Sequence, residues 1–216
     1  MNELSEQLKG RFLVFDGPDG SGKSTQIDRF SSWCEKHAVG IDLVREPGGT
    51  AIGEAIREIL LNPVHQEMTV RAEMLLYMAS RSQLVRERIR PSLDRGDLVL
   101  ADRFISSTLA YQGTAGGLSA DEILAVGEVA TDGIEPDLVV IFDVDAETSQ
   151  SRLSGEKDRM ELKGTEFHRR VRDGYLSQAA RNPDGYLVID ASMNESEVFD
   201  SLIEGLQSRF VLQAPH

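Results

Sequence analysis

The most constraining feature of this sequence is the glycine-rich stretch GPDGSGKS at residues 17–24. It follows the apolar run Phe12–Phe15 and leads into a segment with a helical pattern that begins at Lys23. This order of strand, glycine-rich turn and helix, with the spacing G-x-x-x-x-G-K-[ST], is typical of a phosphate-binding loop. Glycines allow successive backbone N–H groups to point into one cavity, and the helix adds its positive N-terminal end. We therefore expect the loop to bind the phosphates of a nucleoside triphosphate.

Two side chains of the loop have roles that follow from their chemistry. Lys23 can reach the terminal phosphates as a point charge, and Ser24 can offer its hydroxyl to a Mg²⁺ ion bound to those phosphates. The loop alone does not indicate what happens to the phosphate. The predicted triphosphate-binding residues are Gly17, Pro18, Asp19, Gly20, Ser21, Gly22, Lys23, Ser24 and Thr25.

Length and composition narrow the class of protein. The 216 residues are enough for one α/β domain with a substantial core. Acidic residues outnumber basic ones by 36 to 23, and the net charge of -13 argues against a general affinity for nucleic acid or for an anionic membrane. Residues 1–9 are polar, unlike a signal peptide, and no stretch approaches the ~20 apolar residues of a membrane span. The single cysteine, Cys34, cannot form an intrachain disulfide, so we expect a cytoplasmic protein in which it is a small packed residue.

Short apolar runs alternate with helical patterns along the chain. Continuous apolar runs such as LVVIF at 138–142 are typical of strands buried on both faces of a parallel sheet. We therefore expect a doubly wound α/β fold, with a five-stranded parallel sheet between two layers of helices. The predicted strands are Phe12–Asp16, Ile41–Arg45, Leu98–Asp102, Leu138–Val144 and Tyr186–Asp190. The predicted helices are Lys23–His37, Thr50–Leu61, Thr69–Arg90, Ser119–Thr131, Ala146–Leu153, Thr165–Ala180 and Glu195–Phe210.

Charged residues stand at the carboxyl ends of the predicted strands, where ligands of such sheets bind. Arg45 and Glu46 end the second strand and precede the turn PGGT, which would also suit a plain connection to the next helix. Asp102 and Arg103 end the third strand. Beside a phosphate-binding loop, Asp102 can hold Mg²⁺ directly or through water and Arg103 can bind a phosphate, whereas the alternative is a structural ion pair.

Two further sets of side chains are spaced to share a helix face. Tyr77 and Arg81 are four residues apart, so the ring could stack on a planar base while the guanidinium donates hydrogen bonds to its edge. The alternative is a buried tyrosine beside a surface arginine. Thr108, Tyr111 and Gln112 follow Phe104 at helical spacing and could reach one ligand, although alone they would pass as ordinary helix residues.

A basic segment follows the fourth strand. Residues 152–160, RLSGEKDRM, contain three cations and little apolar anchoring. An enzyme that transfers a phosphoryl group must exclude water and neutralise charge on that group, and a closing segment that delivers arginine does both. Most charged runs are only solvated loops, which is the alternative here.

Taken together, these motifs resemble the thymidylate kinase family of nucleoside monophosphate kinases. The resemblance is carried by GPDGSGKSTQ, REPGGT, YMASR, DRFISSTLAYQG, PDLVVIFDV and GEKDRME, in the family's order and spacing from about residue 11 to 190. DRFISSTLAYQG together with REPGGT is specific to the family, whereas the phosphate-binding loop alone is not. The resemblance implies the three-layer fold of P-loop NTPases, one domain over residues 1–216 and a short mobile lid at about 152–163.

The resemblance also implies a reaction, ATP + dTMP → ADP + dTDP, with Mg²⁺ as cofactor and ATP as co-substrate. Lys23 and Ser24 would hold the ATP phosphates and the metal, with Asp102 as a second candidate metal ligand. Asp19 matches the family's carboxylate near the sugar and phosphate end of the acceptor. The residues implied for dTMP binding are Glu46, Arg57, Tyr77, Arg81, Arg103, Thr108, Tyr111 and Gln112.

Within that set, Arg103 matches the arginine that grips the dTMP phosphate, and Tyr77 matches the aromatic ring stacked on thymine. Arg81 matches the arginine at the edge of the base. Thr108 and Gln112 match positions that line the thymine and its sugar.

Three other carried-over roles concern the sugar and phosphate. Tyr111 matches the residue that crowds the 2′ position and favours deoxyribose. Glu46 belongs to a motif near the metal and the acceptor phosphate, and Arg57 is a possible cation of the acceptor site.

The position of Gly20 bears on how charge is neutralised. Some family members have an arginine there, but this chain has glycine and its cations lie in the lid instead. This resembles the bacterial-type arrangement, in which the lid supplies the catalytic arginine. Arg159 is the first candidate, and Arg152 is implied to lie next to the adenine or the ATP phosphates. The implied catalytic set is therefore Lys23, Asp19, Arg103 and Arg159, acting by direct in-line transfer.

Two rival hypotheses stay open at this point. One is another small kinase on the same fold that acts on a different nucleotide or nucleoside. The other is a regulator that binds a nucleotide without catalysis, although the sequence has no N-K-x-D guanine signature. Because the family forms homodimers, we expect a homodimer here, formed through the helix Thr69–Arg90.

Overall fold

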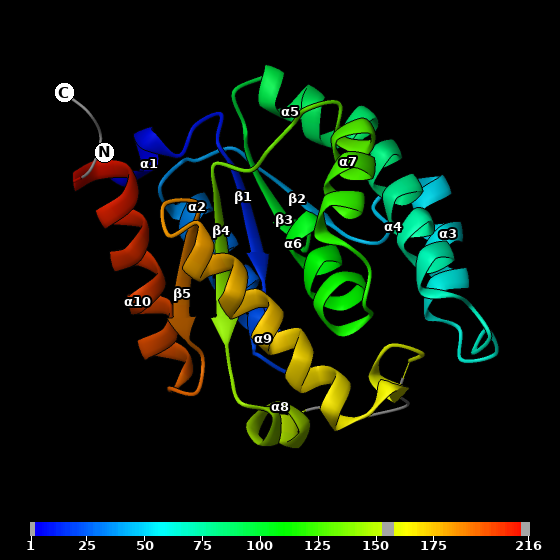
Figure 1. Ribbon diagram of the computed structural model, residues 1–216. Coiled ribbons are helices and arrows are strands. Elements are labelled where there is room, and N and C mark those ends of the chain that lie inside the picture. Colours follow the sequence, from blue (N-terminus) through cyan, green and yellow to red (C-terminus); the bar gives the residue numbers. More distant parts are fainter. Residues whose placement is uncertain (1–2, 153–157, 213–216) are drawn as a thin grey trace.

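The computed structural model describes residues 3–152 and 158–212 of the chain. Five parallel strands form a central sheet in the order β2-β3-β1-β4-β5, and helices cover both of its faces (Figure 1). The predicted α/β fold is therefore confirmed, and each predicted strand ends within one residue of its observed bounds. The strands are β1 (Phe12–Asp16), β2 (Ile41–Arg45), β3 (Leu98–Asp102), β4 (Leu138–Asp143) and β5 (Tyr186–Asp190).

The helices follow the predicted ranges closely. The α-helices are α1 (Glu3–Gln7), α2 (Lys23–Lys36), α3 (Ala51–Leu61), α4 (Val70–Leu84), α5 (Arg90–Asp94), α6 (Ile105–Thr108), α7 (Ala120–Thr131), α8 (Ala146–Arg152), α9 (Thr165–Arg181) and α10 (Glu195–Gln207). In the described part of the chain, three π-helical segments are η1 (Val85–Ile89), η2 (Leu109–Ala115) and η4 (Ser208–Leu212), and one 3₁₀ turn is η3 (Glu161–Lys163).

The short elements α6, η2 and η3 lie outside the predicted helix ranges. The N-terminal helix α1 and the long helix around α4 also differ from the sequence-based expectation. The short helix α1 is not predicted, because five mostly polar residues have no helical period to detect; its Leu4 is nevertheless buried in the core. The predicted helix over 69–90 begins as expected, with the Thr69 hydroxyl accepting from the backbone N–H of Ala72 at 3.3 Å. It then passes through the π-helical turn η1 and continues in α5 to Asp94.

The order of the strands decides which residues meet beside the loop. The central strands β1, β3 and β4 are buried almost throughout, whereas the edge strands β2 and β5 are partly exposed. In the parallel register, Phe15 lies opposite Asp102 of β3, and Asp16 lies opposite Ile141 of β4. The strand that leads into the phosphate-binding loop therefore ends beside Asp102.

The two faces of the sheet carry separate hydrophobic cores, because alternate residues of each strand point to opposite sides. One core includes Phe30 and Cys34 of α2 with Leu202 of α10. The other includes Leu84 of α4 and Tyr175 of α9, and it contains most of the elements that surround the candidate site. Burial raises the pKa of the Cys34 thiol to about 12, as expected for a packed residue. None of the helices in the described part of the chain is both long and apolar enough to cross a bilayer.

Candidate active site

The phosphate-binding loop joins β1 to α2 at the centre of the sheet (Figure 1). Gly20 adopts a φ of 74°, in the left-handed region that favours glycine. A Cβ on Gly20 would overlap the carbonyl oxygen of Ser149 on α8, and the Ser149 hydroxyl donates to the carbonyl of Asp19 at 2.5 Å. Helix α8 can pack on the loop in this way because residue 20 has no side chain. The same packing leaves no room for an arginine at this position.

The loop lysine is held by the end of a neighbouring strand. Lys23 pairs with Asp102 of β3, and the lysine side chain is only 8% exposed. Burial and the nearby Arg103 lower the pKa of Lys23, against the opposing effect of Asp102. Ser24 and Asp102 line a common hollow beside the loop. Their oxygen atoms are ligands of the kind that Mg²⁺ prefers, so these two residues fit the predicted metal.

The arginine of α8 lies on the same side of the loop. The Arg152 guanidinium donates to the carbonyl of Ala191 at 2.9 Å. The Nη1 atom of Arg152 lies 3.9 Å from the position that a Cβ on Gly22 would occupy. The structure therefore places Arg152 next to the predicted phosphate-binding residues.

A fully buried carboxylate at the end of β1, that of Asp16, organises the start of the loop. The sequence indicates only that Asp16 stands at a strand end, and its partners lie far away along the chain. Its donors are the hydroxyls of Tyr175 (2.6 Å), Ser106 (2.6 Å) and Ser107 (2.8 Å), the backbone N–H of Gly17 (2.9 Å) and the guanidinium of Arg103 (3.3 Å). These contacts connect the loop to α6, to α9 and to the end of β3.

Arg103 lies between the loop and the pocket beside it. Its φ of 74° is uncommon and strained for a residue with a side chain. One guanidinium nitrogen pairs with Asp19, and the other donates to the carbonyl of Gly17 at 3.1 Å. Its guanidinium carbon also lies 5.3 Å from the centroid of the Tyr111 ring. Burial alone would lower the pKa of Arg103, but Tyr111 and Asp19 raise it, so the side chain is a permanent cation.

Asp19 is held in turn by two residues of the pocket. The Tyr111 hydroxyl donates to its Oδ2 at 2.8 Å, and Arg103 pairs with its Oδ1. Burial alone would raise the pKa of Asp19, but Arg103 and the Tyr111 hydroxyl outweigh it and lower that pKa. The loop therefore carries an ionised carboxylate that faces the pocket.

A pocket opens beside the loop at the carboxyl ends of β2 and β3, and we call it the main pocket. Asp19 of the loop forms part of its wall, together with seven of the eight residues predicted to bind an acceptor; only Arg81 is not among them. These seven are Glu46, Arg57, Tyr77, Arg103, Thr108, Tyr111 and Gln112. They come from four separate stretches of the chain, and the fold brings them together. The Arg57 guanidinium is fixed by a bond of 2.9 Å to the carbonyl of Pro47.

Arg81 lies behind the wall of the main pocket and is only 1% exposed. It pairs with Glu46 at 2.5 and 2.8 Å and donates to the Thr108 hydroxyl at 3.2 Å. Burial raises the pKa of Glu46, and Arg81 opposes that effect. The alternative of a surface arginine is therefore wrong, because a buried carboxylate holds this guanidinium inside. Tyr77, which shares the helix face, is partly exposed and lines the main pocket.

Part of the predicted lid lies outside the described residues, namely 153–157, which include Lys157. The described part of the predicted lid contains η3. Asp158 and Met160, which precede η3, line the main pocket. The segment before α9 therefore lies against the predicted acceptor side of the site.

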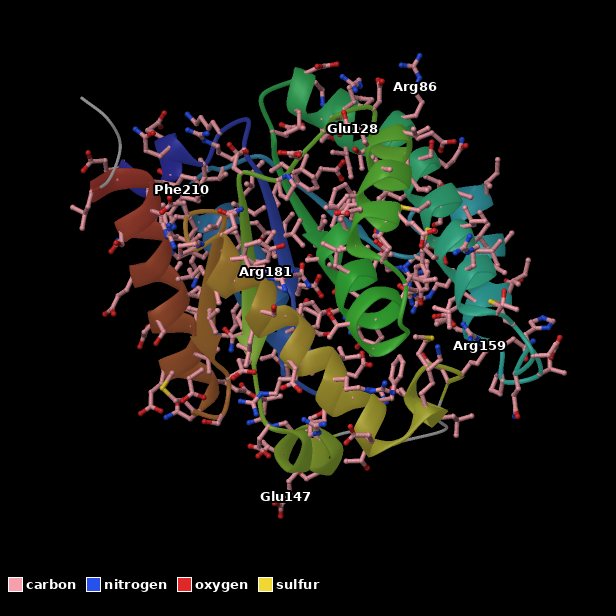
Figure 2. The ribbon with its side chains drawn as sticks, viewed as in Figure 1. Arg86, Glu128, Glu147, Arg159, Arg181 and Phe210 are labelled. Atoms are coloured by element: carbon pink, nitrogen blue, oxygen red, sulfur yellow. The ribbon has the colours of Figure 1, made fainter. Side chains whose placement is uncertain are left out.

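The structure places Arg159 away from the phosphate-binding loop. Figure 2 shows it near α3, whereas Glu147 marks α8 in another part of the molecule. Its guanidinium pairs with Glu73 at 2.6 Å and donates to the carbonyl of Leu60 at 2.7 Å. These two acceptors hold Arg159 between Asp158 and Met160, which line the main pocket. The role of Arg159 at a migrating phosphoryl group stays a prediction.

Sequence reasoning missed Glu73, whose side chain is 1% exposed. It pairs with Lys163 at 2.9 Å as well as with Arg159. Glu73, Tyr77 and Arg81 stand at four-residue intervals, so their shared helix face was the available signal.

Comparisons with known proteins indicate the family of this chain. A family model described as Thymidylate kinase matches residues 15–202. The thymidylate kinase of Geobacillus sp. (strain WCH70) is 44% identical over 206 residues, which cover 94% of this chain and 98% of that protein. The thymidylate kinase of Pelotomaculum thermopropionicum is 46% identical, covering 92% of this chain and 98% of that protein. The crystal structure of thymidylate kinase from Ehrlichia chaffeensis has a TM-score of 0.76 and 32% identity, covering 92% of this chain and 99% of that one. Because these matches span nearly the whole chain, loop and main pocket included, the chain belongs to the thymidylate kinase family.

Proposed function

We propose that this chain transfers the γ-phosphoryl group of ATP to dTMP and releases ADP and dTDP. The observation that carries the proposal is that the main pocket opens at the phosphate-binding loop, where Arg103 contacts the loop and lines the pocket. A monophosphate bound in this pocket would present its phosphate to the loop that holds ATP. The name thymidylate kinase of the relatives supports dTMP as the acceptor. The phosphate-binding loop supports a nucleoside triphosphate such as ATP as the donor.

The main pocket suits a nucleoside monophosphate. Tyr77 offers a ring for stacking on the base, and Thr108 and Gln112 offer hydrogen bonds to its edge. Arg103 offers a permanent cation to the acceptor phosphate. We assign Arg81 to the base side of the pocket, where it holds the Thr108 hydroxyl in place.

The donor side consists of the loop backbone, Lys23 and Ser24, with Arg152 beside it. Lys23 would exchange Asp102 for the ATP phosphates, which frees the carboxylate of Asp102. Ser24 and Asp102 would then hold Mg²⁺, which neutralises charge on the phosphates when it is bound. This exchange keeps the buried ammonium group of Lys23 paired with an anion throughout.

Catalysis in this site needs positioning and charge compensation more than a strong base. The second pKa of a phosphate monoester is about 6, so most of the acceptor phosphate is already a dianion near neutral pH. It can attack in line, without a covalent enzyme intermediate. Lys23 and Arg103 compensate the charge, and Asp19 keeps Arg103 in place.

A coupled assay with ATP and a panel of monophosphates tests the proposal. We expect dTMP to have the highest kcat/KM among dTMP, dUMP, dCMP, dGMP and AMP, and we expect chelation of Mg²⁺ to abolish turnover. Preference for another acceptor would favour a different kinase on this fold. ATP binding without turnover of any acceptor would favour a regulator.

Tyr111 provides a test of sugar selection. We expect Tyr111→Ala to relax discrimination against ribothymidine monophosphate, because the ring that lines the pocket is lost. Tyr111→Phe is the matched control: it keeps the ring but loses the hydrogen bond to Asp19, so discrimination persists while kcat/KM falls roughly tenfold. The measurement is kcat/KM for both nucleotides, and an unchanged ratio in Tyr111→Ala defeats the assignment.

Arg159 provides a test of the lid. For Arg159→Ala we expect kcat to fall by roughly a hundredfold, with a much smaller change in the KM for dTMP, because a cation at the migrating phosphoryl group acts in the transition state. Lys163→Met is the control, because it removes the other cation that pairs with Glu73. A raised KM with unchanged kcat in Arg159→Ala would instead give Arg159 only the anchoring role that its contacts indicate.

We further propose that the chain forms a homodimer and that the dimer interface includes the exposed face of α3 and α4. Ile52 and Ile59 of α3 and Leu75 of α4 are exposed large apolar side chains, and a dimer interface would bury them. Sedimentation equilibrium is expected to give twice the chain mass of 23.9 kDa. A species of one chain mass at all concentrations would contradict the proposal.

We also propose that the chain is one domain over residues 1–216, with a lid at about 152–163, and that it acts in the cytoplasm. The two cores share one sheet, which supports a single folding unit. The single buried Cys34 suits a reducing compartment. Cell fractionation that finds the protein outside the cytoplasm would overturn the assigned location.

A further inference from the structure

Glu73 is a buried carboxylate that the proposed chemistry does not use. Its side chain is 1% exposed and lies on α4, on the same helix as Tyr77. Three groups from two other segments converge on it. They are the Gln112 amide of η2 at 2.7 Å, the Arg159 guanidinium at 2.6 Å and the Lys163 ammonium at 2.9 Å. A buried charge with this many matched partners is costly to remove, so its location needs an explanation.

The bond to Gln112 determines which way that amide points. An ionised carboxylate accepts hydrogen bonds and has no proton to donate, so it can face only the NH₂ group of the amide. Burial alone would raise the pKa of Glu73, but Lys163, Gln112 and Arg159 outweigh it and lower that pKa, so the carboxylate stays ionised. The amide oxygen of Gln112 is therefore turned away from Glu73.

That oxygen belongs to a residue of the main pocket wall. Among the described residues, none is found to donate a hydrogen bond to it. The wall of the main pocket thus offers a hydrogen-bond acceptor at Gln112, in the part of the pocket shared with Tyr77 and Thr108.

We propose that Glu73 is a positioning residue that fixes the Gln112 amide with its oxygen toward the main pocket and thereby selects bases that present an N–H donor there. Thymine and uracil carry a proton on N3, whereas N3 of cytosine is an acceptor and would face the amide oxygen with like polarity. This inference rests on the proposed function, because it takes a pyrimidine monophosphate as the occupant of the main pocket. If Gln112 could turn freely, its NH₂ group would serve cytosine as well.

The segment before α9 supports the arrangement. Arg159 and Lys163 lie on either side of Met160, which lines the main pocket, and both pair with the same carboxylate. Arg159 pairs with Oε2 of Glu73, whereas Lys163 donates to both carboxylate oxygens, at 2.9 Å to Oε2 and 3.1 Å to Oε1. Gln112 donates to Oε1 at 2.7 Å, so it shares that oxygen with Lys163. Glu73 therefore contacts both Gln112, which would recognise the base, and the segment that lies against the acceptor side of the pocket.

The test is Glu73→Gln, which keeps the size of the side chain but can donate as well as accept, so both orientations of Gln112 become possible. The readout is the ratio of kcat/KM for dTMP to that for dCMP, together with equilibrium binding of each nucleotide by calorimetry. We expect the ratio to fall roughly tenfold or more, while kcat at saturating dTMP changes less.

Two controls separate orientation from a general structural effect. Lys163→Met removes an ion pair from the same carboxylate but keeps Arg159 and the carboxylate itself, so the ratio is expected to stay unchanged. Glu122→Gln removes an exposed ion pair with Arg71 on α7 and α4 and is expected to change neither activity nor the ratio. An unchanged ratio in folded Glu73→Gln overturns the inference, as does an equal fall in Lys163→Met.

A measurement on the unaltered protein covers the case in which Glu73→Gln does not fold. In protein labelled with ¹⁵N-glutamine, the side-chain NH₂ of Gln112 is expected to exchange with solvent more slowly than that of the exposed Gln66, with and without dTMP. Equal exchange rates would overturn the inference. Failure of the proposed function is distinguishable, because it shows in the unaltered protein as absence of dTMP binding and turnover.

Discussion

The candidate site depends on the buried carboxylate of Asp16. A charge without solvent is costly unless hydrogen bonds and cations satisfy it, and Asp16 obtains them from residues 87 to 159 positions away, including Arg103 and Tyr175. The same carboxylate accepts the first N–H of the phosphate-binding loop. Loop and Arg103 are therefore held in one rigid frame. Transfer between two bound phosphates needs this, because an error of about 1 Å in their separation is enough to slow it severely.

Buried carboxylates paired with cations also position side chains in and behind the wall of the main pocket. Glu46 is buried with Arg81, and Glu73 is buried with Arg159 and Lys163. In each case, removal of one partner would leave an uncompensated charge inside the protein, so the side chains have few alternative positions. Buried ion pairs contribute little net stability compared with apolar packing, but here they fix the groups that face a ligand. Rigidity of the pocket before binding reduces the entropy that binding would otherwise cost.

The sequence predicts those parts of the site whose signal is local. The spacing of the loop, the apolar strands and the acid-base pair at Asp102 and Arg103 can all be read within a few residues, and the structure has them where expected. The four-residue spacing of Tyr77 and Arg81 gives their shared face but not their burial, which depends on Glu46, 35 residues from Arg81. The sequence shows that Arg159 is a basic residue, but it does not show that Glu73 is the acceptor with which Arg159 pairs. Tertiary partners decide such cases, and a single sequence carries no local trace of them.

The acidic residues of this chain include the carboxylates that pair with cations in the candidate site. The chain carries 13 more acidic than basic residues, and two of its candidate phosphate-binding cations are paired with acids: Lys23 with Asp102, and Arg103 with Asp19. An anionic substrate therefore competes with an internal carboxylate instead of meeting an exposed positive patch. Exchange of Asp102 for a phosphate keeps the buried ammonium group of Lys23 compensated, and the ion pair with Asp102 stabilises the site when it has no ligand. It also favours ligands whose negative charges match the positions of the displaced carboxylates, so the same pairs that stabilise the fold discriminate among phosphates.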